Sequence, residues 1–80
     1  MPQEIEVFPN PTVDQLQVKW PKDFPLQVAY QITDFSGRLV EQGQLAKGQR
    51  LPLNSFRSGY YNLKLQAEND VYVGKFVVKK

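Results

Sequence analysis

The side chains with the widest chemical repertoire in this sequence are its carboxylates, because the chain contains no histidine and no cysteine. The aspartates Asp14, Asp23, Asp34 and Asp70 lie far apart, at positions typical of turns and strand ends. A pair of carboxylates can cleave a glycosidic bond, but a chain of 80 residues has little room for a cleft. Without imidazole or thiol groups, most general-base chemistry and structural zinc sites are lost. We expect no enzyme, no metal site and no cofactor.

The basic side chains are the next candidates for a functional site. Ten Lys and Arg residues against eight Asp and Glu residues give a formal charge of only +2. They are scattered, except for Lys75, Lys79 and Lys80 near the end of the chain. Nucleic-acid-binding proteins usually carry a clustered basic stripe, so we expect no nucleic-acid partner. The sequence also lacks an apolar run of the roughly 18 residues that a membrane span needs, and its first residues do not resemble a signal peptide.

The elements that must position these residues are strands, because apolar and polar residues alternate along most of the chain. The alternating segments are residues 4–8, 16–20, 26–33, 38–45, 51–53, 60–66 and 71–78. About seven short strands at regular spacing, separated by turn residues, are typical of an antiparallel β-sandwich. We therefore predict an all-β, Ig-like sandwich that forms a single domain over residues 1–80. The loop at residues 54–59 could hold one helical turn.

The aromatic residues offer one functional alternative. Trp20 and Tyr30 alternate with polar neighbours and are expected to face the core. Tyr60 is out of phase with the apolar residues that follow it, so we expect it to be exposed. Small β-sandwiches often use exposed aromatic rings as platforms for sugars. A carbohydrate-binding or adhesion module of a secreted protein is therefore the alternative function.

Four motifs, taken in order, resemble a known bacterial family. They are VFPNPT at residues 7–12 followed by DQL at 14–16, ITDFSGRLV at 32–40, LNSFRSGYY at 53–61 and GKFVVK at 74–79. Their order and spacing are similar to those of the type A C-terminal sorting domain of proteins exported by the type IX secretion system of Bacteroidetes. The resemblance covers essentially the whole chain. Phe56 stands where the family usually has a leucine.

The resemblance implies a function in protein export. The domain would be the tail of a larger secreted protein, with a cargo domain on its N-terminal side. It would direct the cargo from the periplasm across the outer membrane to the cell surface or the medium. Its partners would be the outer-membrane translocon and a surface peptidase that removes the tail.

The last strand is the predicted recognition element. An extended segment can be bound through main-chain hydrogen bonds along an exposed sheet edge, with alternate side chains giving specificity. The alternative is that the lysines only protect that edge from unwanted pairing, and both roles are compatible. An exposed edge strand would also allow the domain to form a dimer. The candidate recognition residues are Lys75, Phe76, Val77, Val78, Lys79 and Lys80.

A second candidate site is the turn at Gly37 and Arg38. Gly37 is expected to provide a positive φ angle for the turn. Arg38 has no evident structural role in the sequence, so its guanidinium is a candidate to bind a carboxylate on a partner. Residues 9–11 (PNP) are expected to set the path of the first crossover, and we assign them no contact.

Overall fold

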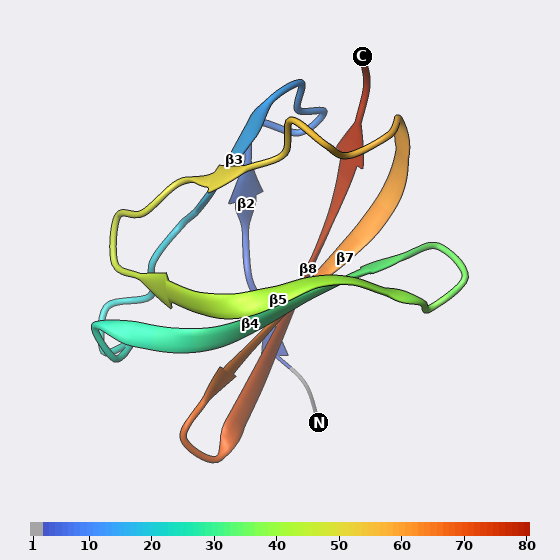
Figure 1. The fold of residues 1–80 in the computed structure, drawn as a ribbon. Coiled ribbons are helices and arrows are strands. Elements are labelled where there is room, and N and C mark those ends of the chain that lie inside the picture. Colours follow the sequence, from blue (N-terminus) through green and yellow to red (C-terminus); the bar gives the residue numbers. More distant parts are fainter. Residues whose placement is uncertain (1–2) are drawn as a thin grey trace.

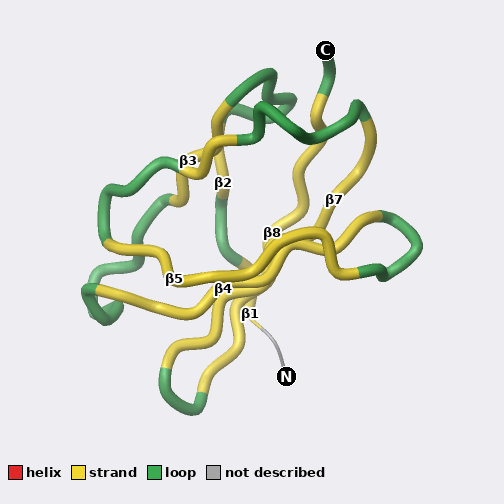
Figure 2. The backbone as a smooth tube through the Cα atoms, in the orientation of Figure 1, coloured by secondary structure: helices red, strands yellow, loops and turns green. Residues whose placement is uncertain are grey.

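The computed structural model describes residues 3–80, and within this range all regular structure is β (Figures 1 and 2). The strands are β1 (Gln3–Glu4), β2 (Val7–Phe8), β3 (Gln15–Val18), β4 (Gln27–Asp34), β5 (Leu39–Ala46), β6 (Leu51–Pro52), β7 (Gly59–Ala67) and β8 (Asp70–Val78). The expected helical turn at residues 54–59 is wrong. That loop instead holds a tight turn, in which the Phe56 N–H donates to the Leu53 carbonyl over 3.0 Å. Residues 3–80 contain no helix long and apolar enough to cross a membrane.

The strands form two sheets that pack as a sandwich, so the predicted all-β fold is confirmed. The large sheet has the order β1-β8-β7-β4-β5, and the small sheet has the order β2-β3-β6. There is one strand more than expected because residues 4–8 divide between the sheets. β1 pairs with β8 of the large sheet and β2 with β3 of the small one. The β1–β8 pairing is parallel, an exception to the expected antiparallel arrangement.

The core lies between the sheets and is built by the alternation seen in the sequence. In the hairpin of β7 and β8, every second residue points inward, so that Leu63, Leu65, Phe76 and Val78 are almost completely inaccessible. Burying each such side chain contributes about 1.5 to 3 kcal/mol relative to leaving it exposed. The other buried hydrophobic residues are Ile5, Val7, Leu16, Val28, Ile32, Leu45, Leu51, Leu53, Phe56, Tyr61 and Ala67.

Tyr30 and Trp20 pack against this core, as expected. The Tyr30 hydroxyl donates to the Glu41 carboxylate over 2.9 Å. Burial and this bond to a carboxylate raise the pKa of Tyr30 to about 12. The Trp20 indole N–H donates to the Pro25 carbonyl over 3.1 Å, and its ring meets that of Phe24 edge-on. Both aromatic residues therefore have a partner for their polar atom, as buried aromatic residues usually do.

The final strand is among the longest in the molecule. Its register with β7 runs from the Gly59–Val78 pair to the Ala67–Asp70 pair without a break. The two strands form a long hairpin within the large sheet, drawn in orange and red in Figure 1. The C-terminal segment is therefore a structural part of the core, and its side chains are held in fixed positions.

Candidate recognition surface

The candidate residues of β8 divide between the core and the surface. Phe76 and Val78 are each only 1% exposed, because their side chains point into the sandwich. Lys75 is exposed and Val77 is half-buried, because alternate residues of a strand face opposite sides of its sheet. Lys79 follows the strand and is also exposed. The accessible side chains of this group are therefore those of Lys75, Val77, Lys79 and Lys80, whereas Phe76 and Val78 belong to the core.

The outer edge of β8 is covered, so the expected exposed edge at the last strand is wrong. Two parts of the N-terminal segment, residues 3–5 and 10–12, lie along this edge, while β2 between them pairs with β3 of the small sheet. The Ile5 N–H donates to the Val73 carbonyl over 3.0 Å, and the Thr12 N–H donates to the Val77 carbonyl over 2.8 Å. The Lys79 N–H in turn donates to the Thr12 carbonyl over 2.9 Å. Alternation shows which face of a strand is buried but not which strand lies beside it, and so the sequence did not reveal this cover.

Asn10 completes the cover where the N-terminal segment leaves β8 to join the small sheet. Its Nδ2 donates to the Lys75 carbonyl over 3.1 Å, and its Oδ1 accepts the Val77 N–H over 3.0 Å. The carboxamide thus binds the β8 backbone as the peptide group of a neighbouring strand would. No contact was assigned to residues 9–11 from the sequence, and these two bonds of Asn10 are therefore an addition to the role expected of this segment.

Gly74 allows the same segment to approach β8 closely. A Cβ atom at this position would lie 2.7 Å from the carbonyl oxygen of Ile5 and 3.1 Å from its Cγ2. Real Cβ atoms do not approach a backbone oxygen so closely, and the backbone cannot rotate away as a side chain can. A residue other than glycine would therefore displace the N-terminal segment from the edge of β8.

Lys80 is bound differently from the other two lysines. Its N–H donates to the Ser58 hydroxyl over 3.0 Å. Its Nζ donates to the carbonyl oxygens of Leu53 and Asn54 over 3.1 and 2.9 Å. These bonds tie the end of the chain to the loop before β7. All three lysines are exposed, but Lys80 has a structural role through these bonds, whereas within residues 3–80 no such bond is found for the Lys75 and Lys79 side chains.

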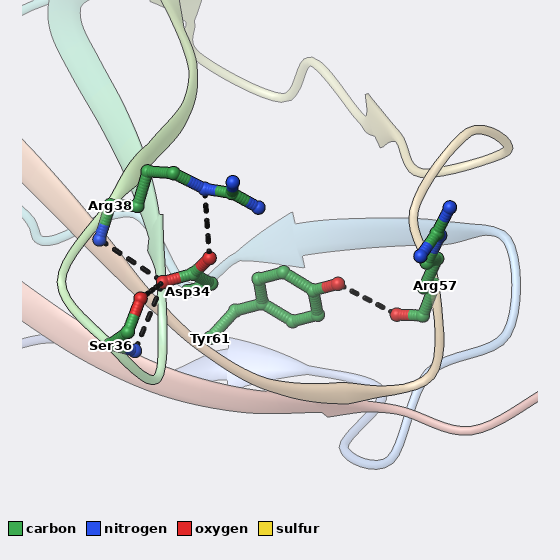
Figure 3. Close-up of polar contacts among 5 residues, drawn as sticks. All are labelled: Asp34, Ser36, Arg38, Arg57 and Tyr61. Atoms are coloured by element: carbon green, nitrogen blue, oxygen red, sulfur yellow. Dashed lines mark hydrogen bonds and ion pairs between the residues drawn. The ribbon is translucent and has the colours of Figure 1, made fainter.

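The turn between β4 and β5 is organised by the Asp34 carboxylate (Figure 3). Its Oδ1 accepts the hydroxyl and the N–H of Ser36 over 2.7 and 3.0 Å and the N–H of Arg38 over 3.0 Å. Bonding to Ser36, together with the Arg38 N–H and charge, lowers the pKa of Asp34. Gly37 has a φ of +90°, as the turn prediction requires.

Arg38 has a structural contact that the sequence did not indicate. Its Nε lies 3.4 Å from Oδ2 of Asp34 in an ion pair, although the side chain is 82% exposed. An exposed ion pair of this kind contributes little to stability. The expectation that Arg38 has no structural role is therefore wrong in part, but most of its guanidinium remains accessible.

Tyr61 holds the preceding loop against this end of the sandwich. Its hydroxyl donates to the Arg57 carbonyl over 2.7 Å, as Figure 3 shows. Its ring stacks on Phe76 at a centroid distance of 5.5 Å and meets Phe56 at 5.2 Å. Phe56, which replaces a leucine usual in the resembling family, is therefore accommodated within an aromatic cluster.

One surface groove lies between the β4–β5 turn and β8, although Gly37 and Arg38 themselves do not line it. The groove has a volume of about 470 Å3 and is bordered by the β4–β5 turn, β7 and β8. Its lining residues are Asn10, Phe35, Tyr60, Tyr61, Asn62, Lys75, Phe76 and Val77. Phe35 is 83% exposed and Tyr60 is 70% exposed, so two aromatic rings border the groove. Sequence reasoning identified Tyr60 as exposed but missed Phe35 and Asn10, because neither lies in a regular alternating pattern.

The described residues offer no catalytic or metal-binding arrangement. No group of three or more His, Cys, Asp or Glu residues comes together among residues 3–80. Asp34 is engaged within its own turn. The groove instead combines aromatic and aliphatic side chains with one lysine at its border.

A comparison with protein-family models gives a match over residues 6–79, to the secretion system C-terminal sorting domain. The chain belongs to this family. The sorting domains are signals carried by secreted cargo, and the family is not catalytic. No match was found among curated proteins. The matched range includes the N-terminal cover from residue 6 onward, the β4–β5 turn and all of β8.

Proposed function

We propose that this sorting domain directs a cargo protein, attached on its N-terminal side, across the outer membrane through the type IX secretion system. A surface peptidase then separates the domain from its cargo. The observation that carries the proposal is the joining of two family motifs, the β4–β5 turn and the last strand, in one exposed groove. The fold does not require these two motifs, which are far apart in the sequence, to share an exposed surface. A partner that binds both motifs at once does require such a shared surface.

The partner recognises side chains, because the backbone edge of β8 is already occupied. Tyr60 and Phe35 provide apolar area, and aromatic residues are the most frequent anchors of protein interfaces. Lys75 and Lys79 provide positive charge on the same strand and just beyond it. Arg38 adds a guanidinium next to the turn that carries Phe35. A partner segment with an apolar anchor and nearby carboxylates matches these groups.

The test is the export of a fluorescent reporter fused to the domain in a host with a working type IX system. Deleting residues 75–80 would be uninformative, because it removes Phe76 and Val78 from the core. The variant Lys75→Glu/Lys79→Glu instead changes exposed side chains only. Its matched control is Lys22→Glu/Lys47→Glu, which changes the net charge equally at exposed positions in other turns.

We expect the first variant to lose most surface delivery while its melting temperature stays close to that of the wild type. The control variant should be delivered normally. Equal delivery of both variants would refute a role for the two lysines. Failure of the wild-type fusion to reach the surface would refute the sorting function itself.

A carbohydrate-binding function is the second candidate, and the same groove is what favours it. Tyr60 and Phe35 are exposed and line the groove together with the carboxamide of Asn62. Aromatic faces and amides are groups that bind sugar rings and hydroxyls. Binding of the isolated domain to a glycan array, abolished by Tyr60→Ser, would support this function. Normal export of the Tyr60→Ser fusion would then separate sugar binding from sorting.

A further inference from the structure

The other outer edge of the large sheet belongs to β5, and it is open over a short stretch. Among residues 3–80, β5 pairs only with β4. The register with β4 pairs Val28 with Leu45 and Tyr30 with Gly43. The outer side of β5 therefore presents the main-chain groups of every second residue.

The outward-facing groups can be assigned from one hydrogen bond. The Lys47 N–H donates to the Leu26 carbonyl over 2.9 Å, so these residues form a hydrogen-bonded pair that continues the β4–β5 register. In an antiparallel ladder, hydrogen-bonded and non-hydrogen-bonded pairs alternate. The N–H and C=O groups of Gln42 and Gln44 therefore point away from β4. Ala46 follows the same rule, and its N–H is taken by Oε1 of Gln49 over 2.9 Å.

The edge is protected at both ends but not in the middle. Gln49 covers the end at Ala46, and a bulge interrupts the other end, where the register changes from the Ile32–Glu41 pair to the Thr33–Leu39 pair. Bulges are a common way to prevent edge pairing. What remains is residues 42–44, which we call the open window. It carries neither the charge nor the proline that usually protects such an edge.

The open window is complementary to itself. It is neutral, and the nearest charged residue of β5, Glu41, accepts a hydrogen bond from Tyr30. Gly43 has no side chain to obstruct a close approach at the centre of the window. Gln42 and Gln44 also border a shallow groove of about 420 Å3, whose other polar side chains are Gln31, Lys64 and Gln66. Carboxamides both donate and accept hydrogen bonds, so two such surfaces can bind each other.

We propose that a second copy of this chain pairs with the open window in an antiparallel dimer. The two-fold axis passes between Gly43 and the partner subunit's Gly43, which lie opposite each other as a non-hydrogen-bonded pair. Gln42 then exchanges both main-chain hydrogen bonds with Gln44 of the partner subunit, and symmetry repeats this pair. Four main-chain hydrogen bonds form, and the carboxamides of the two copies lie side by side.

The dimer is weak, because a window of three residues buries much less than the roughly 1,000 Å2 of a stable interface. Self-association is therefore expected at roughly millimolar protein and not under dilute conditions. A second copy fits better than an acidic or basic segment, since the window offers no charge for such a segment to neutralise.

The test combines sedimentation with amide NMR spectra over a range of concentrations. The wild type should show a rising average mass, and the amide signals of Gln42 and Gln44 should shift with concentration. Gln44→Pro removes two of the four hydrogen bonds by deleting an outward N–H, and so should remain monomeric at millimolar protein. Gln42→Lys/Gln44→Lys places like charges opposite each other across the dimer and should also be monomeric.

A charge-reversed variant, Gln42→Glu/Gln44→Glu, should be monomeric alone and should pair with the lysine variant when the two are mixed. The control Gln15→Lys/Gln17→Lys alters the same residue type on β3, which is paired on both sides, and should self-associate as the wild type does. No self-association of the wild type at several times this concentration would overturn the proposal. Wild-type behaviour of Gln44→Pro, or shifts confined to β8, would also overturn it.

Discussion

The two outer edges of the large sheet differ in how they are protected. The β8 edge is covered by another part of the same chain, through main-chain bonds from Ile5 and Thr12 and the carboxamide of Asn10. The β5 edge is protected only at its ends, by a bulge and by Gln49. The strand with the candidate sorting residues is thus fixed on both sides. The difference leaves β8 with accessible side chains but an occupied backbone edge, whereas β5 keeps outward main-chain groups at Gln42 and Gln44.

The largest loss of stability should come from adding a side chain at Gly74, where the N-terminal segment approaches β8 closely. Gly74→Val would force a side chain against the Ile5 carbonyl, where even a Cβ atom would be at 2.7 Å. We expect a loss of about 2 kcal/mol in the free energy of unfolding, as for other overpacked sites. Urea denaturation measures it.

The matched substitution at the β5 edge is Gly43→Ala. Its Cβ would lie 3.2 Å from a carbon of the Tyr30 ring, which is a side chain and can move slightly. The reduced chain entropy of the unfolded state offsets the contact, so we expect a change below about 0.5 kcal/mol. Equal costs for the two substitutions would show that the N-terminal segment does not hold β8 closely.

The next effect concerns the side chains that bind main-chain groups at each edge. Asn10→Ala removes two hydrogen bonds to β8 and should cost about 1 kcal/mol, with faster hydrogen exchange at the Val77 amide. Gln49→Ala removes one exposed bond to Ala46 and should cost at most about 0.5 kcal/mol. Protection of Val77 that is unchanged in Asn10→Ala would contradict the role assigned to this carboxamide.

Substitutions of the two final lysines should differ by a smaller amount in the free energy of unfolding. Lys80→Ala removes the bonds to Leu53 and Asn54 and should cost about 0.5 kcal/mol. Lys79→Ala changes an exposed side chain and should leave the thermal midpoint unchanged. In the export assay the order should reverse, with Lys79→Ala the more harmful. A larger stability loss in Lys79→Ala would show that the structural roles are assigned to the wrong lysine.

The smallest change in stability is expected at the turn that leads into β5, and it should depend on pH. The lowered pKa of Asp34 means that its carboxylate stabilises the fold above the ordinary aspartate pKa of 3.8, and that this contribution is lost as the pH falls through the lower folded value. Asp34→Ala should therefore be less stable than the wild type at pH 7. The difference should shrink in strongly acidic solution, which denaturation at both pH values would reveal. A difference independent of pH would rule out the carboxylate as its cause.

Alternation along the chain was sufficient to predict the sandwich and most of its core, because it records which side of a strand is buried. It correctly placed Leu63, Leu65 and Phe76 inward. It could not show that residues 4–8 divide between two sheets, since each part is only two residues long. Nor could it reveal the neighbour of β8, because the pairing of residues 65 or more positions apart is set by tertiary packing.

The candidate site was predictable only in part, for a related reason. Lys75 and Arg38 could be identified from motifs, and Gly37 from the backbone needs of its turn. Phe35 gave no signal, because a turn position does not indicate whether an aromatic ring will be exposed. The function of Asn10 was hidden because asparagine next to proline is also explained by turn formation alone.

The parallel pairing of β1 with β8 has a mechanical consequence. Because β1 pairs in parallel with the first half of β8, the start of β1 and the end of β8 lie toward opposite ends of the molecule (Figure 2). Tension applied to the chain before residue 3 and to residue 79 would slide the two neighbouring segments along each other. The bonds from Ile5, Asn10 and Thr12 would then be loaded together in shear and would not open one after another. Tension between these two points should therefore unfold the domain at a higher force than an arrangement in which the same bonds opened in turn.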